Sequence, residues 1–106
     1  MALSFDAIVV GAGQAGPSLA GRLTAAGLRV AVIERKHVGG TCVNTGCMPT
    51  KALVPSAYAA HLARRAADYG VKLDAAVAVD PVALKARQRN IAETARAGVW
   101  SGGPQR

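Results

Sequence analysis

The sequence has 106 residues, of which 51% are hydrophobic, 4% aromatic and 18% charged, and its formal net charge is +7. This length allows one domain at most, and the hydrophobic content excludes an intrinsically disordered chain. The basic residues are scattered and no run of stacking aromatics accompanies them, so nucleic acid is not expected as a partner despite the positive charge.

Membrane insertion and secretion are not expected either. The N-terminus lacks a basic region, and Asp6 and several glycines interrupt its apolar stretch. No stretch approaches the roughly 18 continuous apolar residues that a bilayer span needs. We therefore predict a cytoplasmic location and no membrane partner. In that compartment a cysteine pair is more often catalytic, redox-sensing or metal-binding than a structural disulfide.

A strand followed by a glycine-rich turn opens the chain. Residues 5–10, FDAIVV, predict a strand that is buried on both faces of a parallel sheet. The next six residues form a GxGxxG motif, in which Gly11 makes the tight turn and Gly13 lets the backbone approach a pyrophosphate. Gly16 lets the following helix lie close to the strand, and that helix directs its free amides at the phosphates. Its apolar positions run from Ala15 to Ala26, and Gly27 is expected to end it.

A second strand is predicted over residues 29–34, RVAVIE, and it ends on an acidic residue. Glu34 stands eighteen residues after Gly16, about where the fold places a carboxylate to hold ribose hydroxyls. A GxGxxG motif alone is weak evidence, and a merely tight strand-to-helix turn is the alternative. The order of strand, motif, helix, strand and acidic residue therefore predicts a dinucleotide site.

Both cysteines lie in residues 39–51, GGTCVNTGCMPTK. Five positions apart, Cys42 and Cys47 cannot be bridged within a regular helix. Residues 43–46 must therefore leave the helical path if the sulfurs are to meet, and Asn and Gly tolerate a left-handed backbone. Closing so short a ring removes little entropy from the unfolded chain, so a bond here is a better redox switch than a structural staple.

A helix that begins around Cys47 would place Lys51 one turn later on the same face. A helix N-terminus and a nearby cation both favour the reactive thiolate, so Cys47 is expected to face a cofactor ring and Cys42 the solvent and substrate. Two inert buried thiols or half of a zinc site are the alternatives. Zinc is disfavoured because the spacing is not CxxC and His37 and His61, expected to be surface residues, show no matching spacing.

The second half of the chain predicts two helices. Residues 52–67 favour a helix with a kink or a fresh start near Pro55, closed by Gly70. Residues 71–79 favour a loop or short strand. Asp80 and Pro81 predict the start of a helix that runs to about Ala97 and ends at Gly98. We therefore expect a partial nucleotide-binding domain over residues 1–98 and an unstructured tail over residues 99–106.

Three segments, FDAIVVGAGQAG, VAVIER and GGTCVNTGCMPTKAL, resemble the N-terminal part of the pyridine nucleotide-disulfide oxidoreductases. This family includes dihydrolipoamide dehydrogenase, glutathione reductase and mercuric reductase. The resemblance runs from about Phe5 to about Gly70, and more loosely to about Ala95. Within the family, the NTGCMPTK form is most similar to the mercuric reductase-like enzymes. The resemblance implies an α/β fold: an incomplete Rossmann-like FAD-binding domain made of a parallel βαβ start and a redox-disulfide helix.

The resemblance also implies FAD as the cofactor, with electrons passing from NAD(P)H to flavin and then to a Cys42–Cys47 disulfide. Cys47 would be the charge-transfer thiolate, Cys42 the thiol that meets the substrate, and Lys51 the cation near the reactive edge of the flavin. The implied substrate is a small-molecule disulfide or a thiol-bound metal ion, and no resident metal is implied. The residues implied to bind the cofactor are Gly11, Gly13, Gln14, Ala15 and Gly16 at the pyrophosphate, Glu34 and Arg35 at the adenosine end, and Gly40, Thr41, Gly46, Cys47 and Lys51 further along it.

The chain departs from this family in what it lacks. The family continues with the rest of the FAD domain, an NAD(P)H domain and a C-terminal domain that forms a homodimer, so we expect the isolated chain to be inactive. Mercury reduction also calls for further cysteines, and Pro55 interrupts a helix that is unbroken in the family. The alternatives are a dihydrolipoamide dehydrogenase-like fragment and a non-catalytic nucleotide-binding or thiol-redox module. The missing third strand leaves an open sheet edge, which is an association liability.

Overall fold

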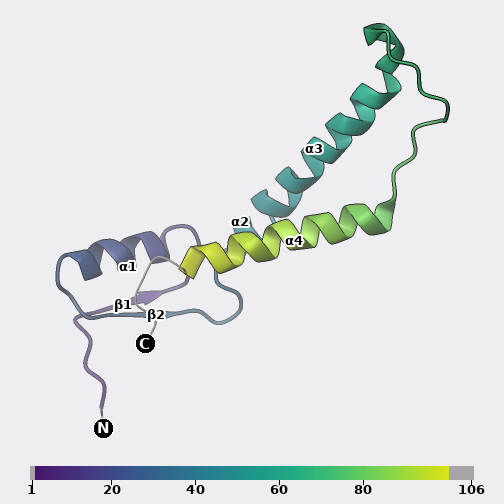
Figure 1. Ribbon diagram of the computed structural model, residues 1–106. Coiled ribbons are helices and arrows are strands. Elements are labelled where there is room, and N and C mark those ends of the chain that lie inside the picture. The colour runs from purple at the N-terminus through teal and green to yellow at the C-terminus, as the bar shows by residue number, and fades with distance from the viewer. Residues whose placement is uncertain (1, 101–106) are drawn as a thin grey trace.

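The computed structural model describes residues 2–100 and shows an elongated molecule with extents of 69 × 24 × 19 Å. A small βαβ unit forms one end, and two long helices lead away from it (Figure 1). The elements are β1 (Ala7–Val10), α1 (Gly16–Ala25), β2 (Val30–Ile33), α2 (Gly40–Asn44), α3 (Cys47–Arg64), the 3₁₀ helix η1 (Ala66–Tyr69) and α4 (Pro81–Trp100).

The βαβ unit confirms the predicted start of the fold. β1 and β2 pair in parallel, with Ala7 opposite Val30 and Val10 opposite Ile33. The connecting helix α1 ends before Gly27, whose φ of 87° only glycine adopts readily. Its ten residues match the predicted helix to within one residue at each end. The described residues thus form a two-stranded parallel sheet with one crossover helix.

The prediction that β1 is buried on both faces is wrong for the described chain. Val9 is only 8% exposed, whereas Ile8 is 62% and Val10 82% exposed. Successive side chains of a strand point to opposite faces, and α1 contacts the sheet on one of them. Ile8, Val10 and Ile33 therefore form an open apolar face, because no other described element packs against it.

The two cysteines lie on either side of a break between α2 and α3, as the spacing predicts. The break is narrower than predicted, because Val43 and Asn44 still belong to α2 and only Thr45 and Gly46 lie outside a helix. The left-handed backbone that Asn and Gly tolerate is not used here. Thr45 has φ of −135° and Gly46 has φ of −118°, so a negative-φ bend redirects the chain.

Helix α3 runs without interruption through Pro55, so the predicted fresh start at this residue is wrong. A proline removes one intrahelical hydrogen bond, and the remaining bonds of an 18-residue helix keep it continuous. The guanidinium of Arg87 donates to the Ala52 carbonyl, three residues before Pro55, and joins α4 to this part of α3. Helix α3 ends at Arg64, earlier than predicted, and Gly70, with φ of 73°, closes the 3₁₀ helix η1 that follows it.

Helix α4 begins as predicted and ends later than predicted. The Asp80 carboxylate accepts hydrogen bonds from the backbone amides of Val82 (2.9 Å) and Ala83 (3.0 Å), which confirms the N-cap. The helix continues past Gly98 to Trp100, because a helical glycine costs only about 1 kcal/mol relative to alanine. The first two residues of the predicted tail are therefore helical, and residues 101–106 lie outside the described part.

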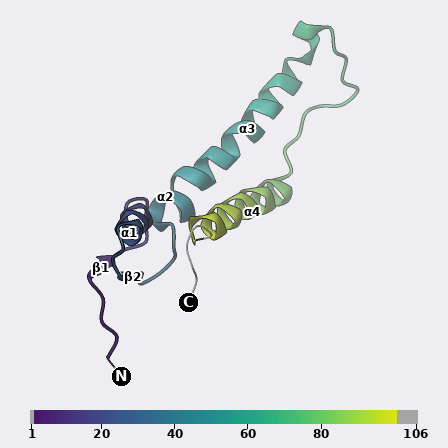
Figure 2. The same cartoon turned by 60° about the vertical axis from the view of Figure 1, so that its left-hand side comes forward.

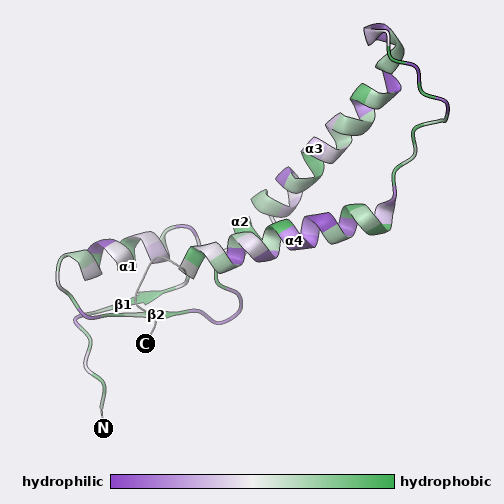
Figure 3. Cartoon of the chain, viewed as in Figure 1, coloured by the Kyte–Doolittle hydropathy of each residue, from purple (hydrophilic) through white to green (hydrophobic). Residues whose placement is uncertain are grey.

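Helices α3 and α4 meet near α2 and diverge away from it, as both views show (Figures 1 and 2). The middle of α4, where it passes the start of α3, is hydrophilic (Figure 3). Polar contacts join the helices there: Gln88 donates to the Pro49 carbonyl at 3.2 Å and Arg87 to the Ser56 hydroxyl at 3.2 Å. No helix among residues 2–100 is long and apolar enough to cross a membrane.

The buried core of the described chain is small and consists of two groups. Three of its residues lie in the βαβ unit and three lie on α2, α3 and α4. They are Val9, Ala12, Ala20, Val43, Ala52 and Ala92. None of them is larger than valine, so each contributes little buried area. The packing between these elements therefore depends strongly on backbone and polar contacts.

Candidate functional site

The glycine turn has the geometry that its motif predicts. Gly11 has φ of 102°, and its amide donates to the Ile33 carbonyl at 2.7 Å, which joins the turn to β2. A Cβ on Gly16 would collide with the Gly11 carbonyl group, so only glycine lets α1 start this close to β1. A Cβ on Gly13 would meet nothing within 4 Å, so the space in front of the turn is open.

The start of α1 is free to bind an anion. Ala15 precedes the helix, no side chain caps it, and its first turn contains no acidic residue. The first amides of a helix lack intrahelical partners and lie at the positive end of its dipole. A phosphate group in the open space before Gly13 would satisfy them, so these residues fit a dinucleotide pyrophosphate. Gln14, the other predicted residue of the turn, is exposed.

The Glu34 carboxylate binds the glycine turn itself. Its Oε2 accepts a hydrogen bond from the Ala12 amide at 2.8 Å, and its Oε1 accepts one from the Lys36 amide at 2.9 Å. These two bonds, the first above all, lower the pKa of Glu34, and the charge of the exposed Arg35 adds a smaller effect in the same direction. Glu34 thus makes a structural contact with the glycine turn that its place in the motif does not reveal.

The segment that carries the cysteines packs directly on the glycine turn. The Gly39 amide donates to the Ala12 carbonyl at 2.7 Å. A Cβ on Gly40 would lie 2.9 Å from the Cα of Gly13, and Gly40 itself has φ of 64°. Only glycine allows this approach without strain. The predicted nucleotide turn and the predicted redox segment therefore form one continuous site.

Cys42 and Cys47 form a disulfide, with their Cα atoms 4.6 Å apart. Cys42 lies on α2 and is partly buried, whereas Cys47 is the first residue of α3 and is exposed. A Cβ on Gly46 would lie 3.1 Å from the Thr41 carbonyl oxygen, so the turn between the helices is tight. The pairing that the resemblance implies is confirmed.

Lys51 lies four residues after Cys47 on α3, as predicted, and its side chain is exposed. Within residues 2–100 it makes no hydrogen bond or ion pair, so its ammonium group is available to a ligand on this face of the helix. Thr41 is likewise exposed. His37 and His61 are both exposed, and the described residues contain no cluster of candidate metal ligands.

One contact of the site has no signal in the sequence. Asn44, between the cysteines, accepts a hydrogen bond from Nε of Arg96, which is 52 residues further along the chain. Asn44 belongs to the cysteine motif, but nothing in that motif points to a partner on a later helix, and Arg96 belongs to no recognised motif. Only the return of α4 toward α2 brings the two side chains together.

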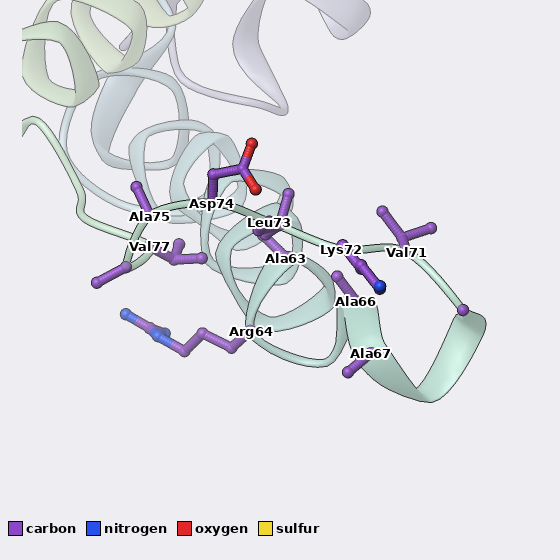
Figure 4. A pocket seen from close by; sticks show the side chains of 12 residues that line it. Ala63, Arg64, Ala66, Ala67, Val71, Lys72, Leu73, Asp74, Ala75 and Val77 are labelled. Atoms are coloured by element: carbon purple, nitrogen blue, oxygen red, sulfur yellow. The ribbon is translucent and has the colours of Figure 1, made fainter.

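A separate cavity of about 690 Å³ lies at the far end of α3 (Figure 4). Side chains of the last turns of α3, η1 and the following loop line it, among them Arg64, Leu73 and Val77. None of the predicted site residues takes part. The cavity is therefore distinct from the site formed by the glycine turn and the disulfide.

Together these features define a class: an α/β protein with a parallel βαβ nucleotide-binding start and a disulfide held against the glycine turn. The sequence profile of the pyridine nucleotide-disulphide oxidoreductases matches residues 5–101. The chain therefore belongs to the pyridine nucleotide-disulphide oxidoreductase family, and its fold is the start of the Rossmann-like domain of that family.

Known relatives agree with this assignment. The chain is 41% identical to a dihydrolipoyl dehydrogenase of Rhizobium etli over 99 residues, which are 93% of this chain and 21% of the relative. It is 36% identical to the dihydrolipoyl dehydrogenase of Bacillus subtilis with the same coverage of both chains. The chain thus spans about a fifth of the length of these relatives.

Solved structures give the same result. The copper(II) complex of the HOCl-induced flavoprotein disulfide reductase RclA from Escherichia coli superposes with a TM-score of 0.66 and 32% identity, over 93% of this chain and 19% of that chain. A cysteine mutant of the same protein, also as its copper(II) complex, gives a TM-score of 0.71 and 31% identity with the same coverage.

Proposed function

We propose that this chain is the FAD-binding, redox-active-disulfide portion of a flavoprotein disulfide oxidoreductase. The observation that carries the proposal is the close approach of Gly40 to Gly13, which packs the disulfide segment on the glycine turn. A cofactor whose pyrophosphate lies at the turn then extends toward the disulfide. Membership of the family supports FAD as this cofactor.

The residues present fit FAD. Gly11, Gly13 and Gly16, together with the amides at Gln14 and Ala15, would hold the pyrophosphate before the uncapped start of α1. Glu34 and Arg35 would lie at the adenosine end, and Gly40, Thr41, Gly46, Cys47 and Lys51 toward the flavin. When bound, FAD would relay two electrons from NAD(P)H to the disulfide.

The cysteines have different surroundings that suit different roles. Reduction of the disulfide consumes two electrons and two protons and leaves two thiols. Cys47 begins an 18-residue helix, and the helix N-terminus together with the charge of Lys51 favours its thiolate. We assign the exposed Cys47 to the cofactor side, where a bound flavin would cover it. Cys42 is assigned to exchange with the substrate.

The substrate of the complete enzyme is a dithiol, its disulfide, or a thiol-bound metal ion. The similarity to dihydrolipoyl dehydrogenases supports a dithiol substrate. The mercuric reductase-like specialisation rests on the NTGCMPTK sequence alone and stays a prediction. The cytoplasmic location and a homodimeric complete enzyme are likewise proposals.

Binding of FAD by the purified chain tests the proposal. In a Gly13→Ala variant the added methyl group points into the open space before the turn, so stability is kept and FAD affinity falls by about tenfold or more. Gly21→Ala is the matched control, because its methyl group also meets nothing and lies within α1, away from the turn. Visible absorbance of flavin that stays with the protein after gel filtration measures binding. Equal binding by both variants would refute the assignment of the turn.

Turnover tests the prediction that the 106-residue chain is inactive alone. The chain contains one glycine motif, which we assign to FAD, and no second nucleotide site is recognisable in its sequence. We expect no sustained oxidation of NADPH or NADH when FAD and a disulfide substrate are added. Steady turnover would contradict this expectation and would favour a redox module that functions by itself.

A further inference from the structure

Asn44 lies between the cysteines and makes three hydrogen bonds, which use both donors of its amide group and one acceptor position of its oxygen. Its Nδ2 donates to the carbonyls of Val38 (3.0 Å) and Gly40 (2.8 Å), and its Oδ1 accepts from Nε of Arg96 at 2.6 Å. Carbonyls only accept and the guanidinium only donates, so one orientation of the amide satisfies all three bonds. Asn44 is partly buried, which makes these bonds costly to lose.

The same bonds connect α4 to the cofactor side of the site. Arg96 lies on α4, Asn44 ends α2, and the carbonyls that Asn44 binds flank Gly39. The Gly39 amide in turn donates to Ala12 in the glycine turn. A chain of hydrogen bonds therefore runs from α4, through the residues between the cysteines, to the nucleotide turn.

We propose that Arg96 is a positioning residue that acts through Asn44 and holds the segment between the cysteines in the geometry that favours the Cys42–Cys47 disulfide. The two sulfurs can bond because the bend at Thr45 and Gly46 brings their Cα atoms to 4.6 Å. After reduction, a segment held in this geometry keeps the two thiols close and raises their effective concentration. Loss of the Arg96–Asn44 bond loosens the segment and makes the disulfide easier to reduce.

The exchange with dithiothreitol measures this effect without a cofactor. In this reaction the protein disulfide takes up two electrons and two protons and becomes two thiols, while the dithiol of dithiothreitol is oxidised to its cyclic disulfide. The full chain is equilibrated at graded ratios of reduced to oxidised dithiothreitol, and its thiols are counted by alkylation and mass spectrometry. The half-reduction ratio is the ratio of reduced to oxidised dithiothreitol at which half of the protein disulfide is reduced. We expect Arg96→Ala to lower it by about three- to tenfold, the effect of one hydrogen bond. Asn44→Ala removes all three bonds of its amide group and should lower the ratio by at least as much.

The double variant and a matched control test whether the two residues act as one unit. Because they share one contact, the Arg96→Ala/Asn44→Ala variant is expected to shift the ratio no further than Asn44→Ala does. Arg89→Ala removes the same charge from the same helix at an exposed residue and is expected to leave the ratio unchanged. Additive shifts, or an equal shift in the Arg89→Ala control, would overturn the proposal.

Two conservative variants separate the hydrogen bond from the charge. The Nε2 atom of glutamine occupies the same place along the side chain as Nε of arginine, so Arg96→Gln keeps the donor and removes the charge. Arg96→Lys keeps the charge and has a carbon at that place. We expect wild-type behaviour for Arg96→Gln and the shifted ratio for Arg96→Lys, and the reverse result would overturn the proposal. Both variants keep a long side chain, so they test it even if Arg96→Ala fails to fold.

The inference rests on the proposed redox role of the cysteine pair, and its test needs neither FAD nor NAD(P)H. Failure of FAD binding would therefore refute the proposed function and leave the exchange result intact. An unchanged exchange ratio in the Arg96 and Asn44 variants would refute the positioning role alone.

Discussion

At the scale of single residues, Glu34 shows how a carboxylate can stabilise a turn through backbone amides. Its two carboxylate oxygens accept hydrogen bonds from the backbone amides of Ala12, in the glycine turn, and Lys36. These bonds favour the charged form and lower the pKa of Glu34. The carboxylate expected to hold a ribose therefore also stabilises the turn that holds the pyrophosphate.

The lowered pKa predicts how stability depends on pH. A carboxyl group with a lower pKa in the folded state contributes stability above its unfolded pKa, and this contribution is lost as the pH falls through the folded pKa. Thermal unfolding of the wild-type chain should therefore show a fall in melting temperature across the acid range. Glu34→Gln should be less stable at neutral pH and should show a flatter acid profile. Parallel profiles for the two proteins would contradict the role of Glu34 in the turn.

At the scale of elements, helix α3 contains two prolines in different environments. Pro49 is in the first turn, where a backbone amide would have no intrahelical partner. Pro55 lies in the interior and deprives the Lys51 carbonyl of its partner. The helix tolerates both, and α4 packs across this region with donors to the carbonyls of Pro49 and Ala52.

We predict opposite effects of the two proline-to-alanine substitutions. Pro55→Ala restores a hydrogen bond in the helix interior and should raise the free energy of unfolding by about 1–2 kcal/mol. Pro49→Ala restores no such bond and increases the conformational entropy of the unfolded chain. It should therefore be neutral or destabilising by about 0.5 kcal/mol. Urea unfolding monitored by circular dichroism measures both. A destabilising Pro55→Ala would show that the proline itself makes a favourable contact.

At the scale of the whole molecule, the open apolar face of the sheet is the main liability of the isolated chain. Val10 is 82%, Ile8 62% and Ile33 52% exposed on this face, next to unpaired strand edges. The buried core includes no residue larger than valine, so little apolar area offsets this exposure. Any further surface that covers this face of the sheet would therefore stabilise the chain.

Self-association of the isolated chain is therefore expected to depend on this face. The Ile8→Thr/Val10→Thr variant keeps β-branched side chains in the strand and removes much of the apolar surface. It should sediment as a smaller species than the wild-type chain at the same concentration. Val79→Thr/Val82→Thr is the control, because both valines are at least half exposed and lie far from the sheet. Equal shifts in both variants would show that the sheet face has no special role.

The local features of this protein follow from its sequence alone. The order of strand, glycine turn, helix and strand, the N-cap at Asp80 and the break between the cysteines depend on short-range backbone preferences and on motif spacing. These features were predicted to within a few residues. Where a local rule failed, at Pro55 and Gly98, the cost of one unfavourable residue was too small to end a long helix.

Only the tertiary structure decided which of these features meet. Three contacts join residues that lie 22 to 52 positions apart, and no spacing in the sequence signals them. They are the contacts of Gly40 with Gly13, Glu34 with Ala12, and Arg96 with Asn44. The open face of β1 likewise depends on which elements cover the sheet, not on the apolar composition of the strand. Such contacts depend on the path of the whole chain, since each needs several elements to be placed at once.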